Sequence, residues 1–362
     1  MNCITVLAAF ALTAATEDPE FSWTDVRELA FEGQGWTEVR SPFDRLPRKA
    51  EGVVRDPVWK LSRDSAGMCA RFVTDSTSIA CRWSLRSDGL SMPHMPATGV
   101  SGVDLYVRDV EGTWRWLACP RPTRKEMTAT LISDLPEGTR EYRLYLPLYN
   151  GVSSCEIGVL EGSKIGPGPD HPRGLSLPIV FYGTSITHGG CASRPGMPHP
   201  AILGRRLDRP VINLGFSGNG TMDMEIADLL GELEPAVYVV DCLPNMNGAQ
   251  VSERVVPFVK RLRRHRPDTP ILLVEDRSFS NSFLQPSRQR HHAASRAALK
   301  AGFEALQREG VPHLQYLEGA ELLGNEDTVD GSHPSDLGFV RQADLFFPVL
   351  QELLEGSEQR TH

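Results

Sequence analysis

The pattern of apolar and polar positions divides the chain into two halves that meet near residue 165. From residue 20 to about 165, short apolar and aromatic runs of strand length recur between turn sequences such as Ser87-Asp-Gly89 and Asn150-Gly151. Runs at this spacing predict an antiparallel β-sandwich or jelly roll over residues 20–165. The expected strands are 66–73, 78–83, 103–110, 114–119, 128–132, 141–146 and 155–160.

The second half, residues 175–357, alternates apolar runs with helical periodicity. Such alternation predicts a parallel sheet covered by helices on both faces, which is a three-layer α/β/α fold. The expected strands are 179–182, 211–214, 236–240, 271–274 and 313–317, and the expected helices are 198–207, 223–233, 252–264, 287–308 and 337–354. Between the halves, residues 162–174 are rich in Gly and Pro, which predicts a linker with His171 on its surface.

Composition restricts the class of protein. The 362 residues suffice for about two domains, and 40% hydrophobic with 23% charged residues is typical of a soluble globular chain. A net charge of -8 argues against a nucleic-acid partner, because phosphates require a basic surface.

Residues 1–16 are apolar with small residues at their end. This pattern predicts a secretory signal cleaved near Ala15, and hence a periplasmic or extracellular protein; the alternative is a cytoplasmic chain that begins with an ordinary strand. The run is too short to cross a bilayer, so no integral membrane segment is expected.

Cysteine and histidine spacing gives no metal motif. Six of the seven cysteines lie beyond the leader, and an even number permits disulfides whose pairing the sequence leaves open. C-x-x-C spacing is missing from the sequence, and His291-His292 does not belong to an H-E-x-x-H motif. We therefore expect neither a metal nor a cofactor.

Ser185 is the first candidate for chemistry. It lies just after the apolar run 179–182, in Gly183-Thr-Ser185. Ligands of open α/β sheets bind beyond the carboxyl ends of the strands, so a serine at this point can meet a substrate as a nucleophile. The alternative is that Ser185 only caps the following helix.

Three further motifs follow later strands. Gly218 lies in a glycine-rich loop that can bring backbone N–H groups close to a ligand. The Asn245 amide can donate to an oxyanion or merely form a turn. Asp330 can fold back through Gly331 onto His333 and orient the imidazole as a base, whereas a helix-capping role for His333 is the alternative.

Taken in order, these four motifs resemble those of the SGNH hydrolases, also called GDSL-type esterases. The resemblance covers residues 178 to about 350 and implies a metal-free hydrolase of acyl esters. Ser185 would be the nucleophile, His333 the base and Asp330 the residue that orients it. The oxyanion hole would comprise the N–H groups of Ser185 and Gly218 and the side chain of Asn245.

The chain departs from this family pattern at two motifs. Thr184 stands where the family has aspartate before the serine, so the role of that aspartate is unfilled. Pro244 and Met246 flank Asn245, where glycine and aspartate are usual, which bears on the placement of the asparagine.

A shorter resemblance concerns the first half. Gly102-Val-Asp-Leu-Tyr106 is similar to the GxDLY-type N-terminal domains of a bacterial subgroup, and a β domain ahead of the hydrolase is similar to two-domain carbohydrate esterases. We therefore expect a serine esterase that removes small acyl groups, acetyl above all, from a carbohydrate or small-molecule ester.

Two alternatives stay open beside this function. One is a lipase or thioesterase with the same machinery, and the other is a non-catalytic carbohydrate-binding protein with an inactive hydrolase half. His188, Arg194 and Arg277 lie in loops near the expected strand ends, which makes them candidates for substrate binding.

Overall fold

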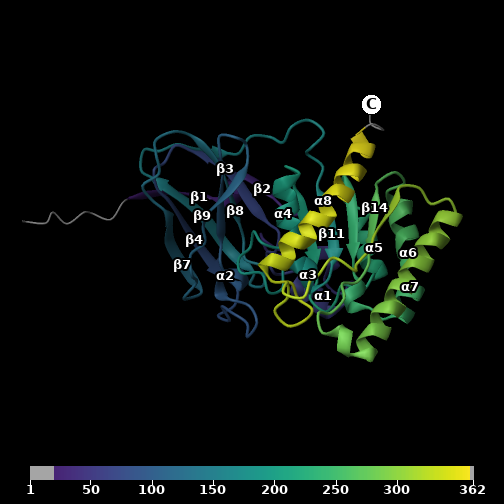
Figure 1. Ribbon diagram of the computed structural model, residues 1–362. Helices are drawn as coiled ribbons and strands as arrows, with labels where there is room; N and C mark the ends of the chain where they lie inside the picture. The colour runs from purple at the N-terminus through teal and green to yellow at the C-terminus, as the bar shows by residue number, and fades with distance from the viewer. Residues whose placement is uncertain (1–19, 359–362) are drawn as a thin grey trace, which may run out of the picture.

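The computed structural model describes residues 20–358, so the expected leader at 1–16 lies outside the described part of the chain. Figure 1 shows a β-rich half, coloured purple to teal, beside an α/β half, coloured teal to yellow. Among the described helices, none is both long enough and apolar enough to cross a membrane.

The first half forms two antiparallel sheets (Figure 1). One sheet has the order β1 (Phe21–Asp25), β9 (Val152–Leu160), β4 (Ile79–Leu85), β7 (Glu126–Ile132). The other has the order β10 (Ile165–Pro167), β3 (Cys69–Thr74), β8 (Arg140–Tyr145), β5 (Asp104–Arg108), β6 (Trp114–Ala118), and β2 (Ala30–Glu32) also pairs with β3.

The two sheets enclose a common apolar core. Phe72 from one sheet and Trp83 and Ile157 from the other are among its buried side chains, which alternate with outward-facing residues as a sandwich requires. The predicted β-sandwich is therefore confirmed. The predicted linker is wrong in part, because β10 lies within it and pairs with β3 from Ile165 opposite Thr74.

The second half contains the predicted parallel sheet, in the order β12 (Val211–Gly215), β11 (Ile179–Gly183), β13 (Val237–Asp241), β14 (Ile271–Val274), β15 (Leu314–Leu317). All neighbouring pairs are parallel. Gly183 is in register with Gly215 on one side and Asp241 on the other, so the first three strands end side by side.

Helices cover both faces of this sheet, as predicted. On one face, Val180 and Tyr182 join a core with α5 (Met224–Leu230), α6 (Gly248–His265) and α7 (Pro286–Arg308). On the other face, Ile179 and Phe181 join a core with α4 (His199–Arg206) and α8 (Asp336–Glu358). The remaining helical turns are η1 (Val26–Glu28), η2 (Arg48–Ala50), α1 (Asp56–Leu61), α2 (Ala97–Val100), α3 (Ser185–His188), η3 (Leu243–Asn245) and η4 (Ser282–Leu284).

One segment of the first half packs on the second. Leu46, Val58 and Trp59 are buried in the core that covers the α5–α7 face of the parallel sheet, rather than in the sandwich. Trp36 donates its indole N–H to Glu232 Oε2 at 2.9 Å. This segment places α1 beside the α/β half.

Candidate active site

Ser185 occupies the turn that follows the central strand β11. Thr184 caps the one-turn helix α3 by accepting a hydrogen bond from the N–H of Ile186, and Ser185 begins that helix with 8% of its surface exposed. The turn requires Gly183, because a Cβ there would lie 2.1 Å from Thr187 Oγ1 and 2.7 Å from the Asp241 carbonyl oxygen. The local sequence thus holds a hydroxyl in a tight turn at the edge of the sheet.

His333 reaches Ser185 from the loop before α8. Its Nε2 lies 2.8 Å from Ser185 Oγ, and its Nδ1 lies 2.7 Å from Asp330 Oδ2. Gly331 allows the turn that brings Asp330 back to His333, because its φ of 91° is in the left-handed region that glycine tolerates. The three side chains therefore form a continuous line of hydrogen bonds from carboxylate to hydroxyl.

Asp330 is held in its charged form. Its Oδ1 accepts hydrogen bonds from the backbone N–H groups of His333, at 2.8 Å, and Ser332, at 3.0 Å. Burial would raise the pKa of this carboxyl, but the hydrogen bonds from His333 and Ser332 outweigh burial and lower it below its ordinary value. A charged carboxylate fixes the proton on Nδ1 and leaves Nε2 free to accept one.

The two predicted donor loops follow β12 and β13, and Ser217 and Asn219 of the first loop share a cavity with Ser185. Gly218 follows β12 with a φ of 69°, and no atom lies within 4 Å of the position where its Cβ would be, so backbone conformation explains the glycine. Asn245 ends η3 after β13, and its Oδ1 accepts the N–H of Gly220 at 3.2 Å. Because the amide oxygen faces Gly220, the Nδ2 donor faces the other way. The roles of Gly218 and Asn245 as oxyanion donors stay a prediction.

A cavity of about 470 Å³ opens beside Ser185 and His333. Much of its wall comes from the first half of the chain, which the sequence motifs did not indicate. These wall residues are Pro57, Lys60, Leu61, Met92, His94 and Tyr149. Gly190, Ser217 and Asn219 complete the lining from the second half.

Comparison with known proteins gives matches to both halves. A family model described as "GDSL-like Lipase/Acylhydrolase family" matches residues 176–351, and one described as "N-terminus of Esterase_SGNH_hydro-type" matches residues 21–165. A structure from Bacteroides ovatus, described as a GDSL-like lipase, is 32% identical, with 93% of this chain and 98% of that chain covered and a TM-score of 0.87. The chain belongs to the GDSL-like lipase/acylhydrolase family. It is an ester hydrolase of the SGNH type.

More distant structures share the fold of this GDSL-like hydrolase. A family two carbohydrate esterase from Clostridium thermocellum is 16% identical, with 81% of this chain and 96% of that chain covered and a TM-score of 0.55. An acetyl xylan esterase from Butyrivibrio proteoclasticus is 13% identical, with 92% and 99% covered and a TM-score of 0.57. The search of curated proteins gave no match.

His188 does not line the cavity of this GDSL-like hydrolase, contrary to expectation. It is fully buried, its Nε2 lies 2.7 Å from the Leu148 carbonyl oxygen, and its ring stacks on Tyr149 at 4.0 Å. Burial, assisted by the charge of Arg45, lowers its pKa well below the ordinary value. Tyr149 takes the position at the cavity, and His188 supports it from behind.

Arg194 and Arg277 are also away from the serine. Arg277 is 1% exposed and forms a double ion pair with Asp241, including a 2.7 Å contact from Nη2 to Oδ2. Arg194 pairs with Asp104 Oδ2 at 2.8 Å, where the two halves of the chain meet. Each arginine already has a buried carboxylate partner, and neither lines the cavity at Ser185. Their expected role in substrate binding stays a prediction.

One group near the serine has the composition of a metal site. Ligand atoms of Cys191, Asp330 and His333 lie within 4.8 Å of one another. Burial, and next to it the charge of Asp330, raises the pKa of the Cys191 thiol to about 12. Asp330 and His333 are already engaged with each other and with Ser185, which fits serine chemistry better. The sequence left the disulfide pairing open, and Cys191 and Cys242 are both buried free thiols.

Proposed function

We propose that this GDSL-like hydrolase is a serine esterase that removes small acyl groups, acetyl above all, from carbohydrate esters. The observation that carries the proposal is the line of hydrogen bonds from Asp330 through His333 to Ser185, with heavy-atom distances of 2.7 and 2.8 Å. These lie within the range that proton transfer between a base and a nucleophile requires.

In the proposed reaction, Ser185 Oγ attacks the carbonyl carbon of the ester while its proton passes to His333 Nε2. The negative charge that develops on the carbonyl oxygen is met by the N–H groups of Ser185 and Gly218 and by Asn245 Nδ2. The ester C–O bond then breaks, and the leaving alcohol takes the proton from His333. A water molecule, deprotonated by His333, then attacks the acyl carbon. The bond from this carbon to Ser185 Oγ breaks, Oγ takes the proton back from His333, and the acid is released.

The acyl and alcohol parts of the proposal have different support. A cavity of about 470 Å³ that is partly walled by Pro57, Leu61 and Met92 suits a small or medium acyl group. The carbohydrate part rests on the two-domain fold shared with the carbohydrate esterase and acetyl xylan esterase described above. The same apolar wall favours a medium-chain acylhydrolase as the second candidate function.

The test compares hydrolysis of p-nitrophenyl acetate, butyrate and octanoate, and of acetylated xylan, by the intact enzyme and by Ser185→Ala. We expect the variant to lose at least about a thousandfold in kcat on every substrate. Ser153→Ala, in an exposed position of β9, is the matched control and should keep full activity. Equal turnover by the enzyme and Ser185→Ala would refute the serine mechanism, and a preference for octanoate would replace the acetyl assignment with the second candidate.

A further inference from the structure

A second cavity, of about 640 Å³, lies where the sandwich meets the hydrolase half. Its lining shares no residue with the cavity at Ser185. The sandwich contributes Tyr106 and the turn that leads into Trp114, while α4 and α8 contribute the opposite walls, including Ile202 and Phe347. The volume is in the range of pockets that enclose small organic ligands.

Arginines provide all the charged groups that line this interdomain cavity within the described residues. Arg194 pairs with Asp104 at 2.8 Å, and Arg206 pairs with Asp344 at 2.6 Å. Arg205 has no carboxylate within 4.0 Å in residues 20–358. It instead donates to Tyr145 Oη at 3.2 Å and lies over the Tyr106 ring at 4.1 Å. Of these three guanidinium groups, that of Arg205 is therefore the one without a carboxylate at ion-pair distance among the described residues.

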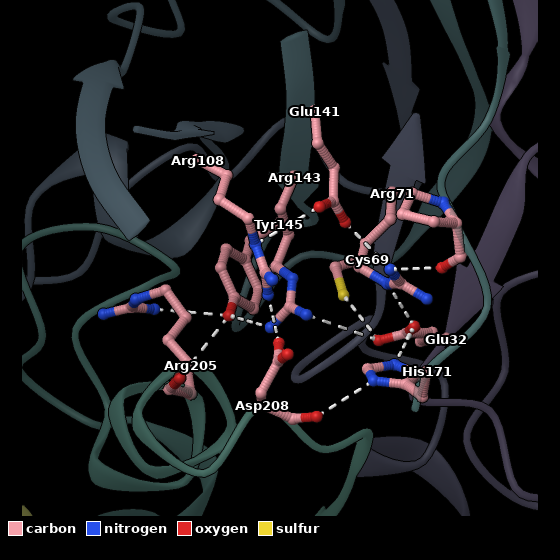
Figure 2. A network of polar contacts seen from close by, with 12 residues as sticks. Glu32, Cys69, Arg71, Arg108, Glu141, Arg143, Tyr145, His171, Arg205 and Asp208 are labelled. Carbon is pink, nitrogen blue, oxygen red and sulfur yellow. Dashed lines mark hydrogen bonds and ion pairs between the residues drawn. The ribbon is translucent and has the colours of Figure 1, made fainter. Parts of the chain in front are cut away.

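A second guanidinium group, that of Arg143, meets the same Tyr145 hydroxyl that Arg205 contacts (Figure 2). Arg143 is 2% exposed and also meets Tyr145 Oη, at 3.3 Å, while its Nε and Nη2 have no hydrogen-bond partner within the described chain. Its nearest carboxylate is Glu32, at 3.8 Å. Two guanidinium groups thus converge on one tyrosine hydroxyl.

The surrounding network does not supply the missing negative charge. Glu32 already accepts from Arg71 Nε at 2.5 Å and contacts His171 Nε2 at 2.7 Å. In the same network Arg71 and Arg108 pair with Glu141, and Arg108 also pairs with Asp208 (Figure 2). Within this network Arg143 and Arg205 are the arginines that donate no hydrogen bond to a carboxylate among residues 20–358.

We propose that the interdomain cavity is a second binding site that takes an organic carboxylate, with Arg205 as the contact for the anionic group. A guanidinium group binds a carboxylate through two parallel hydrogen bonds, and the low dielectric of a partly enclosed cavity strengthens them. Met197, Ile202 and Phe347 form an apolar wall for the body of the ligand, which an inorganic anion would leave unused. An acidic sugar and an aliphatic acid both have this chemistry.

The experiment measures binding of glucuronate and of octanoate to the intact enzyme by isothermal titration calorimetry. We expect one of them to bind, Arg205→Gln to weaken its affinity at least about tenfold, and Arg205→Lys to retain part of it. Arg261→Gln, on α6 and paired with Asp228, is the matched control and should bind as the intact enzyme does. Hydrolysis of p-nitrophenyl acetate reports that each variant is folded, because Arg205 does not line the serine cavity.

Three outcomes would overturn the proposal. They are a lack of binding by either acid up to about 10 mM, equal affinity of Arg205→Gln and the intact enzyme, and competition of the bound acid with p-nitrophenyl acetate for the serine cavity. Val340→Trp, which fills the cavity from α8 without removing a charge, gives a second route to the same answer: it should abolish binding and leave hydrolysis unchanged.

Discussion

The two halves of the chain contribute different things to one site. The second half supplies Ser185, His333 and Asp330, on loops that follow β11 and precede α8. The first half supplies walls, such as Met92 and Tyr149, on the other side of the cavity. Changes in the second half should therefore act on kcat, whereas changes in the first half should act on substrate preference.

A buried arginine of the first half also stabilises the end of a strand in the second half. Arg45 is buried and donates from Nη1 to the carbonyl oxygens of Asn213, at 3.1 Å, and Gly215, at 2.7 Å, at the end of β12. Burial lowers its pKa to about 10, so it remains charged at neutral pH. Through these contacts a residue of the first half fixes the start of the loop that carries Gly218.

The largest effect on kcat in this series is expected from Asp330→Asn, in the second half. An amide at this position favours the wrong tautomer of His333 and cannot stabilise the imidazolium, so we expect kcat on p-nitrophenyl acetate to fall about a hundredfold to ten-thousandfold. KM should change little, because Asp330 does not line the cavity. Steady-state kinetics would contradict the proposed role of Asp330 if kcat stayed within a factor of two or so of the unchanged enzyme.

The next effect is expected at Asn245. Removing one oxyanion donor typically lowers kcat about a hundredfold to a thousandfold, so Asn245→Ala should lose kcat with KM nearly unchanged. Asn247→Ala, which removes the capping residue of α6, is the control for local stability and should keep kcat. If both variants lost activity equally, the Asn245 amide would be a structural group rather than an oxyanion donor.

The sequence predicted the elements and motifs of the second half well, because their signals are local. A strand that ends at Gly183-Thr184-Ser185, or a carboxylate three residues before His333, can be recognised within a few positions. The alternation of strands and helices in the second half and the strands of the sandwich were predicted in the same way, from the spacing of apolar residues.

What the sequence did not reveal depends on contacts between distant segments. His171 was expected on the surface, yet its side chain is 7% exposed and bound to Glu32, which lies 139 positions earlier. Likewise, Arg277, which follows β14, pairs with Asp241 at the end of the neighbouring strand β13, and Tyr149 lines the serine cavity from the first half. Such partners have no signature in local spacing, because the fold alone brings them together.

Glu32 provides a test of how the halves are joined at acidic pH. Burial would raise its pKa, but the hydrogen bond to His171 and the charges of Arg143 and Arg71 outweigh burial and lower it from 4.5 to about 2. Because the pKa of Glu32 is lower in the folded state, the charged carboxylate stabilises the fold fully above about pH 4.5, and this stabilisation is lost as the pH falls towards 2. This lowering of the pKa corresponds to a contribution of about 3 kcal/mol to the free energy of unfolding.

The measurement is urea unfolding of the intact enzyme and of Glu32→Gln between pH 3 and pH 7, the range set by these pKa values. The variant should be less stable at pH 7, and the difference should shrink as the solution is acidified. Glu137→Gln, in an exposed turn of the sandwich, should follow the intact enzyme throughout. A difference that stays constant with pH would show that Glu32 stabilises the fold by packing rather than by charge.

The smallest effect is expected from Met92→Ala, in the cavity wall supplied by the first half. Shortening this apolar side chain enlarges the acyl site. In a well-fitted pocket, one methylene changes the discrimination between substrates by about 1–3 kcal/mol, and we expect a smaller change at this partly exposed position. We expect kcat/KM for p-nitrophenyl octanoate to rise about threefold to tenfold relative to the acetate ester, with kcat on acetate unchanged. Val110→Ala, on the exposed β5–β6 turn, should leave the ratio as it was. Because the reacting groups all belong to the second half, a loss of kcat on acetate in Met92→Ala would mean that the wall also positions Ser185 or His333, and the division between the two halves would fail.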